Sequence, residues 1–172
     1  MLNIVYALST LMLGLALPTF IKAALDGPAW LTSAVLVGNA VLIALLGSTI
    51  TRRLARYRRT RVLCAAAGLR ACWGLALAAI TQGRGTWAMT ALIAAMLLCT
   101  IAEVMHAPAS MALAAATSPL QARGRYLAVF QYSFVAAEII APVFFAPLFG
   151  VSHAAPFLIL GAANIAALGG TL

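Results

Sequence analysis

Long runs of apolar residues, separated by short polar connections, extend over almost the whole chain. Six of these runs have about the length that an α-helix needs to cross a hydrocarbon core of roughly 30 Å, at residues 2–21, 30–50, 62–80, 87–107, 126–148 and about 154–172. None of them shows the alternation of apolar and polar residues that a barrel strand requires. Because a backbone in lipid must satisfy its hydrogen bonds internally, the pattern predicts helices. We therefore expect an all-α membrane protein with six transmembrane helices.

The connections between the runs are short and contain residues that favour turns, at residues 26–28, 82–85, 118–119 and 150–153. An alanine-rich segment, residues 110–116, follows the fourth run, so we expect this helix to continue beyond the bilayer and to end at Ser118-Pro119. No linker or low-complexity segment separates a second domain. The chain, residues 1–172, is predicted to form a single transmembrane domain.

The composition agrees with a membrane protein. Hydrophobic residues make up 65% of the chain and charged residues only 8%, whereas a soluble domain carries about 25% charged residues. So few polar side chains could not cover the surface of a soluble globular enzyme, and they also argue against a disordered segment or a disulfide scaffold. The net charge of +8 would suggest a nucleic-acid partner in a soluble protein. Here we expect no nucleic acid, because most of the basic residues mark one connection between spans.

The basic residues predict how the chain is oriented in the membrane. Lys22 and Arg84 are the only basic residues in the first, third and fifth connections, whereas the second and fourth hold eight arginines, at positions 52, 53, 56, 58, 59, 61, 123 and 125. Basic connections stay in the cytoplasm, so six spans place both termini there as well. We expect an integral, multi-pass protein of the cell (inner) membrane. Binding to anionic lipid headgroups is a further interpretation of the arginine-rich connection.

Little in the sequence points to an enzyme. A serine hydrolase would need a nucleophile on a turn such as Gly-x-Ser-x-Gly, and Ser48 lacks this surrounding pattern. Metal-dependent transfer of lipid headgroups would call for clustered acids, but Asp26 is the only aspartate. The three cysteines lie in apolar runs without the spacing of metal ligands. We therefore expect no catalytic residues, no metal and no cofactor.

An order of residues in the second half of the chain is typical of one transporter family. An acid, a proline-containing helix, an Arg-Gly turn and another proline follow one another, as Glu103, Pro108, Pro119, Arg123-Gly124-Arg125-Tyr126 and Pro142. This order resembles the region that joins the tenth and eleventh helices in the major facilitator superfamily of secondary transporters. In that family the eleventh helix carries a Gly-Pro pair, and here Ala141 stands in the place of that glycine.

The arginine-rich connection resembles a second motif of the same family. The family motif reads Gly, three residues, Asp, Arg, any residue, Gly, and then basic residues. Gly47 and Arg52 keep their places, whereas Thr51 and Leu54 replace the Asp and the second Gly. The resemblance implies that the chain corresponds to helices seven to twelve, half of a major-facilitator-type bundle. It also implies a partner, a missing N-terminal six-helix half or a second copy, and a cytoplasmic gating loop that contains Gly47, Arg52 and Arg53.

Three charged residues lie within the predicted spans, namely Arg70, Glu103 and Glu138. A charge at this depth costs about 3 kcal/mol on insertion scales, so each one needs a partner or a cavity. Glu138 is close to mid-bilayer and is the candidate for proton coupling, since desolvation favours its neutral form and entering water reverses this. The alternative is a structural acid that is hydrogen-bonded between helices. Arg70 and Glu103 form a candidate ion pair between neighbouring helices, and the alternative for Glu103 is a cavity.

Four polar residues in the spans are candidates for lining a substrate path, namely Asn39, His106, Gln131 and Tyr132. Polar residues also join helices in ordinary packing, and this alternative stays open for each of them. These features together lead to the hypothesis of a secondary active transporter, or the C-terminal half of one, that moves a small-molecule substrate by alternating access. Proton-coupled efflux of a drug or metabolite is its most specific form. The alternative is a truncated, non-transporting membrane fragment or assembly partner.

Overall fold

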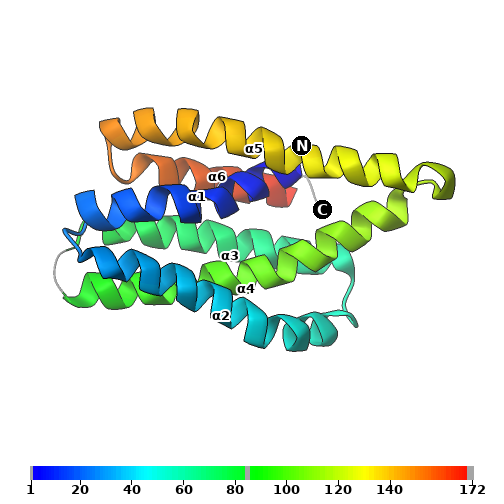
Figure 1. Cartoon of the computed structure of the whole chain (residues 1–172), viewed down its shortest axis with the longest axis horizontal. Coiled ribbons are helices and arrows are strands. Elements are labelled where there is room, and N and C mark those ends of the chain that lie inside the picture. The colour runs from blue at the N-terminus through cyan, green and yellow to red at the C-terminus, as the bar shows by residue number, and fades with distance from the viewer. Residues whose placement is uncertain (1, 84–85, 170–172) are drawn as a thin grey trace.

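The computed structural model describes residues 2–83 and 86–169, and within them the fold is a bundle of helices that run back and forth along one axis (Figure 1). A one-turn 3-10 helix, η1 (Leu120–Ala122), precedes the fifth long element. The α-helices are α1 (Leu2–Ala23), α2 (Ala29–Leu54), α3 (Arg59–Ile80), α4 (Thr86–Thr117), α5 (Arg123–Val151) and α6 (Ala155–Gly169).

Five of these helices, α1 to α5, are long and apolar enough to cross a membrane. The sixth, α6, is equally apolar but has 15 residues, which span about 22 Å at roughly 1.5 Å per residue. The chain is therefore an integral, multi-pass membrane protein, and the prediction of an all-α membrane fold is confirmed. The predicted sixth span, residues 154–172, is confirmed as a helix up to Gly169, and its last residues lie outside the described part of the chain.

Each of α1 to α5 is longer than the span that the sequence predicts for it, and the differences are largest for α4, α5 and α2. As expected, α4 continues through Pro108 and ends at Thr117, directly before Ser118-Pro119. α2 runs to Leu54, although the predicted span ends at residue 50. The reason is that residues 51–54 contain neither proline nor glycine, so nothing in them interrupts the helical hydrogen bonds.

The helices pack so that α2 and α5 flank the bundle. α3 lies against both α4 and α6, whereas α5 packs mainly on α1 and α2 mainly on α4. In the most apolar segment of each helix, 11% of the residues of α2 and 22% of those of α5 are buried within the chain. The corresponding share for α1 is 56%. α2 and α5 therefore present most of their surface outward.

A dense aromatic core fills the half of the bundle that lies away from the start of α1. The ring of Phe157 on α6 meets Phe20 edge to face, with centroids 5.1 Å apart, and meets Trp73 in the same way at 6.4 Å. Nearby, α3 and α6 approach each other closely at Gly74, where an added Cβ would lie 2.8 Å from the carbonyl oxygen of Phe157. Small residues permit such close contact between membrane helices.

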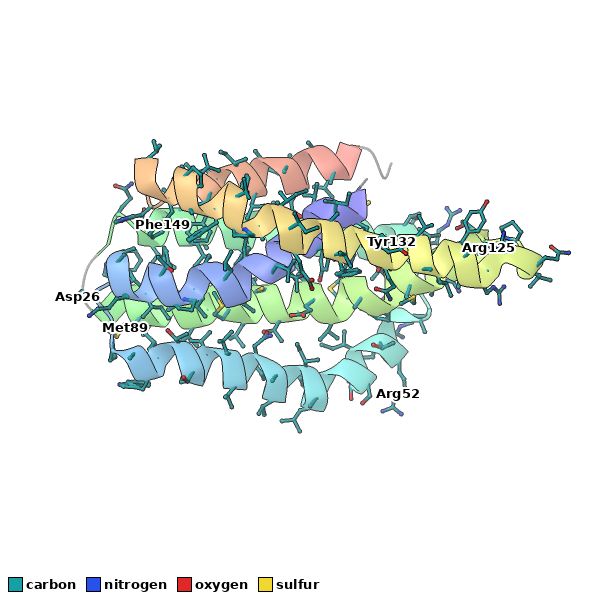
Figure 2. The ribbon with its side chains drawn as sticks, turned by 45° about the horizontal axis from the view of Figure 1, so that its top comes forward. Asp26, Arg52, Met89, Arg125, Tyr132 and Phe149 are labelled. Atoms are coloured by element: carbon teal, nitrogen blue, oxygen red, sulfur yellow. The ribbon has the colours of Figure 1, made fainter. Side chains whose placement is uncertain are left out.

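Apart from Arg70, Glu103 and Glu138, the described charged side chains lie toward the two ends of the bundle. Arg52 and Arg125 lie at one end, and Asp26 lies at the other (Figure 2). Asp26 pairs with Lys22 one turn earlier, with 3.8 Å between Nζ and Oδ1, and both side chains are exposed. The predicted Arg-Gly turn, Arg123-Gly124, is in fact the first turn of α5, and it lies at the same end as the arginine-rich connection.

Candidate functional site

A buried polar cluster surrounds Arg70 near the middle of α3. The side chain of Arg70 has no exposed surface. Its Nη2 donates hydrogen bonds to the Tyr6 hydroxyl at 3.0 Å and to Thr10 Oγ1 at 2.8 Å, and its Nη1 donates to Cys99 Sγ at 3.1 Å. Tyr6 and Thr10 both face Arg70 because residues four apart share one side of a helix. The cluster thus joins α1, α3 and α4 around one charge.

The environment of Arg70 compensates for much of the cost of burying a charge. The guanidinium carbon lies 4.5 Å from the centroid of the Tyr6 ring and 5.8 Å from that of Trp73, which adds cation–π attraction to the hydrogen bonds. The Tyr6 hydroxyl accepts from Arg70 and donates to the carbonyl oxygen of Ala102 at 3.2 Å. Of the three Arg70 nitrogens only Nε lacks a hydrogen-bond partner within the described residues, and the neighbouring Trp73 Nε1 also lacks one.

A second polar group connects α2 to α4. Asn39 Nδ2 donates to Glu103 Oε2 at 3.5 Å, and the Thr100 hydroxyl donates to Asn39 Oδ1 at 2.5 Å. Asn39 and Glu103 are each half-buried. The structure therefore places the predicted cavity residue Asn39 beside the predicted ion-pair residue Glu103, on the side of α4 that faces α2.

The predicted direct ion pair between Arg70 and Glu103 is not formed. Arg70 on α3 and Glu103 on α4 lie in the same region of the bundle. No nitrogen of Arg70, however, lies within 4.0 Å of a Glu103 carboxylate oxygen. The physical reason is that the nitrogens of Arg70 are directed toward α1 and toward Cys99, whereas Glu103 accepts from Asn39. Any attraction between the two charges acts over a longer distance.

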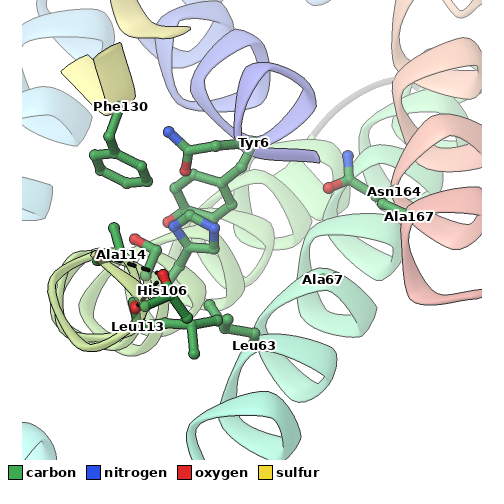
Figure 3. A pocket seen from close by; sticks show the side chains of 12 residues that line it. Tyr6, Leu63, Ala67, His106, Leu113, Ala114, Phe130, Asn164 and Ala167 are labelled. Carbon is green, nitrogen blue, oxygen red and sulfur yellow. Dashed lines mark hydrogen bonds between the residues drawn. The ribbon is translucent and has the colours of Figure 1, made fainter. Parts of the chain in front are cut away.

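His106 lies against the Arg70 cluster, about two turns further along α4 than Cys99. Its ring stacks on Tyr6, with centroids 3.2 Å apart and 9° between the ring planes. The side chain is 8% exposed, and its Nδ1 has no hydrogen-bond partner. His106 lines a cavity together with residues of α1, α3, α5 and α6 (Figure 3). Its place on a substrate path stays a prediction.

The remaining candidates on α5 lie apart from this cluster. Gln131, Tyr132 and Glu138 are all exposed on the surface of the bundle, and Figure 2 shows Tyr132 on α5. Glu138 lies about 22 Å along the helix from Arg123, at roughly 1.5 Å per residue, and so near the middle of α5. Within the described part of the chain it forms neither a hydrogen bond nor an ion pair.

The candidate gating residues Gly47, Arg52 and Arg53 lie within α2 and not in a loop. The arginines are exposed in its last turn. The connection to α3 is consequently short, and at the start of α3 Arg59 Nη1 donates to the carbonyl oxygen of Ala112 on α4, at 2.8 Å. This bond links the arginine-rich segment to the part of α4 that follows Pro108.

Several residues of the cluster were not among the candidates from the sequence. The spacing of Tyr6 and Thr10, four residues apart in an apolar run, is the signal that could have placed them on one helix face. Further polar pairs join distant helices, since Asn3 donates to Ser133 on α5 at 2.5 Å and Asn164 donates to Ser9 at 2.9 Å. Which residues form such pairs depends on how each helix is rotated about its own axis. This rotation cannot be predicted from the sequence alone.

The described residues contain no group of three or more His, Cys, Asp or Glu side chains that could hold a metal ion. No protein-family model matches the chain, and neither the curated proteins nor the solved structures include a match.

Proposed function

We propose that the chain is one half of a secondary active transporter, the C-terminal six-helix half of a bundle of the major facilitator type, which moves a small solute by alternating access. The proposal includes α6 as the sixth crossing. It starts from the resemblance of the Arg-Gly turn and the arginine-rich segment to that family. One observation of the structure carries it, namely the carboxyl group of Glu138 on the outer surface of α5.

A carboxyl group at this position is incompatible with a lipid-facing surface. Ionisable residues within a membrane cost about 3 kcal/mol on insertion scales and face protein or water-filled cavities. Glu138 lies near the middle of an apolar 29-residue helix and is exposed in the isolated chain. Either water or another protein segment must therefore cover this part of α5. A half-transporter supplies both, because its substrate path lies between the two halves.

The low burial of α2 and α5 supports the same proposal. These two helices present the largest uncovered surfaces of the bundle, and they are the helices that would flank the central cavity of the family. Tyr132 and Gln131, which are also exposed on α5, would add polar groups to that cavity. A missing N-terminal half or a second copy of the chain would cover the rest of the surface.

The packing of the helices supports an internal repeat of three helices. When the first three helices are exchanged with the last three, the contact of α1 with α5 becomes the contact of α4 with α2, and both contacts are present. The contact of α3 with α6 is unchanged by this exchange and is also present. Inverted repeats of this kind are the basis of alternating access in many transporters.

Glu138 is the residue that we assign to proton coupling, with efflux of an amphipathic drug or metabolite as the reaction. Its carboxyl group is exposed on α5, on the surface that would face the partner half and the water between the two halves. Apart from Glu138, Gln131 and Tyr132, the exposed surface in the middle of α5 is mainly apolar, which suits an amphipathic solute.

The proposal is tested with the chain and its partner purified together from native membranes and reconstituted into proteoliposomes. We expect wild-type vesicles to move an amphipathic fluorescent dye in response to a pH gradient. Glu138→Gln keeps the shape of the neutral acid, so it should lose transport driven by the pH gradient but retain exchange of dye across the membrane. The matched control adds Gln131→Glu to Glu138→Gln, so that the acid lies seven residues earlier on the same helix. It tests whether coupling to the pH gradient depends on the position of the acid.

Two results would contradict the proposal. Full gradient-driven transport by Glu138→Gln would make Glu138 a structural acid. Failure of the wild-type chain to transport, together with a complex mass that shows one chain alone, would favour the non-transporting fragment.

A further inference from the structure

One end of the bundle carries a positive charge that no neighbouring acid offsets. Eight arginines belong to it, at positions 52, 53, 56, 58, 59, 61, 123 and 125, and Figure 2 shows Arg52 and Arg125 there. The three acids of the chain lie elsewhere, with Asp26 at the opposite end and Glu103 and Glu138 within the helices. An uncompensated charge of this kind attracts anions. At the ends of membrane-spanning helices, the anions closest at hand are those of lipid headgroups.

A groove lies at the same end, between α2, α3 and α4. It has a volume of about 290 Å³ and a mainly apolar wall, to which Leu54, Met105 and Pro108 contribute. Tyr57 and Arg59 also line the groove, and both of these side chains are exposed. The groove thus joins an apolar wall to polar groups that reach the surface.

The depth of the groove matches the level of the headgroups. The apolar runs of the sequence end at residue 50 in α2, begin at residue 62 in α3 and end at residue 107 in α4. The residues that line the groove fall within 51–62 and 105–112. All three helices therefore place it at the limit of the apolar region, where tyrosine side chains such as Tyr57 are enriched. A molecule that fits there has an apolar part on the bilayer side and a polar part on the water side.

Arg59 is positioned to hold a phosphate at this groove. Its Nη1 donates to the carbonyl oxygen of Ala112 at 2.8 Å, which fixes the side chain between α3 and α4. A guanidinium has five N–H donors in a rigid fork that matches a phosphate group, so this bond leaves further donors for a ligand. A second charge lies beside the groove, because the guanidinium carbon of Arg56 is 5.5 Å from the centroid of the Tyr57 ring.

We infer that this groove binds one anionic phospholipid. The phosphate lies at Arg59, with Arg56 as a second positive charge, and part of an acyl chain packs along Leu54, Met105 and Pro108. The headgroup carries a net negative charge, because a zwitterionic lipid would bring its own ammonium group close to the arginines. The site does not include Glu138, so it stands independently of the proposed transport function.

General attraction to an anionic membrane surface differs from this site in one respect. Diffuse attraction involves the arginines of this end alike, at about 1 kcal/mol for each one near the surface. The groove gives Arg59 a role that its neighbour Arg61 lacks, since Arg61 is exposed but does not line the groove. Residues two apart on a helix do not share a face. The two arginines therefore form a matched pair for a test.

Binding is tested by native mass spectrometry of the full chain, freed of lipid and held in detergent micelles. The probes are dioleoyl phosphatidylglycerol, dioleoyl phosphatidylcholine with the same chains, and glycerol 3-phosphate, which has no chains. We expect the first phosphatidylglycerol to bind at least about fivefold more tightly than the first phosphatidylcholine. Glycerol 3-phosphate should not bind at the same concentration, because it lacks the apolar part. Equal affinity for the two lipids would overturn the inference, and so would equal affinity for glycerol 3-phosphate and phosphatidylglycerol.

Substitutions at the headgroup end locate the lipid. Arg59→Gln removes the charge and most of the donors, and should weaken phosphatidylglycerol binding about tenfold, as for the loss of a hydrogen bond to a charged group. Arg61→Gln removes the same charge outside the groove and should weaken it about twofold or less. Equal weakening by both variants would show diffuse attraction and overturn the site.

A second pair of variants tests the apolar wall and gives the decision if Arg59→Gln does not fold. Ala109 lines the groove, whereas Ala107 on the same helix is exposed and does not line it. Ala109→Leu fills part of the groove and should weaken the first bound phosphatidylglycerol at least about fivefold, whereas Ala107→Leu should leave its affinity unchanged. Wild-type affinity in folded Ala109→Leu would place the bound lipid elsewhere.

Discussion

Arg70 donates a hydrogen bond to the hydroxyl of Tyr6 at 3.0 Å while its guanidinium lies over the ring of the same residue. This one contact connects α1 with α3 and places a full positive charge in the interior of an apolar bundle. The charge is held without a carboxylate in direct contact, by hydroxyl and thiol acceptors and by the aromatic ring. The planar shape of the guanidinium allows it to satisfy these partners at once.

The first prediction follows from that shape. Arg70→Lys keeps the charge but replaces a planar fork by a single ammonium, which cannot reach Tyr6, Thr10 and Cys99 together. We expect it to lower the stability of the protein in nanodiscs by about 2 kcal/mol or more. Arg52→Lys, on the exposed end of α2, is the control and should change little. Thermal unfolding that is the same for both variants would argue against a structural role of the guanidinium geometry.

A second prediction concerns the hydroxyl of Tyr6. Tyr6→Phe keeps the ring that stacks on His106 but removes both the acceptor for Arg70 and the donor to Ala102. We expect a loss of about 1–2 kcal/mol in the free energy of unfolding, as for other buried hydrogen bonds. The same substitution at the exposed Tyr132 should have no measurable effect. A small effect at Tyr6 would mean that water or a rearranged Thr10 satisfies Arg70 in its place.

A third prediction tests the close approach of α3 and α6. Gly74→Ala would bring the new Cβ to 2.8 Å from the carbonyl oxygen of Phe157 and 3.2 Å from the backbone nitrogen of Gly161. Because backbone atoms cannot move aside cheaply, we expect destabilisation of about 1–3 kcal/mol. Gly68→Ala, on the same helix with no neighbour within 4 Å, should be neutral or stabilising by up to about 1 kcal/mol. Equal thermal stability of the two variants would contradict this packing.

The sequence predicted the helices well because their existence depends on length and apolarity alone. The predicted spans differ from α1, α3 and α4 mainly at the ends, and the extension of α4 past Pro108 was expected from its alanine-rich continuation. The end of α2 was placed too early, since the arginines were read as a loop. Arginine is a good helix former, and a helix can continue beyond the bilayer into a basic segment.

The rotation of each helix about its own axis could not be predicted in the same way. In a soluble protein the polar face of a helix is exposed to water, so the opposite, apolar face is the buried one. In a membrane, the lipid and the protein interior are both apolar, so an apolar helix gives no such signal. The ion pair of Arg70 with Glu103 was therefore predicted only from their positions on neighbouring helices. In the structure, Arg70 donates hydrogen bonds to Tyr6 and Thr10 instead. For Glu138, its position along the apolar run predicted a depth near mid-bilayer but could not predict that its side chain is exposed on the bundle.

The last prediction concerns the orientation of the chain in the membrane. The arginine-rich end is predicted to be cytoplasmic, so Arg58 and Gln82, in the connections that flank α3, should lie on opposite sides. In a background without the native cysteines, Gln82→Cys should react with an impermeant thiol reagent in intact cells. Arg58→Cys should react only after the membrane is permeabilised. Cys99 is best replaced by serine in this background, because serine retains an acceptor for Arg70.

A control separates orientation from folding in this experiment. Cys99→Ala in the same background removes the acceptor and should lower stability without changing which site is labelled, since the basic residues that determine orientation are unaltered. The reverse labelling pattern, with Arg58→Cys reactive in intact cells, would place the arginine-rich end outside. The chain could then not correspond to the C-terminal half of a major-facilitator-type bundle, because that half has its termini in the cytoplasm at the same end as the arginine-rich connection.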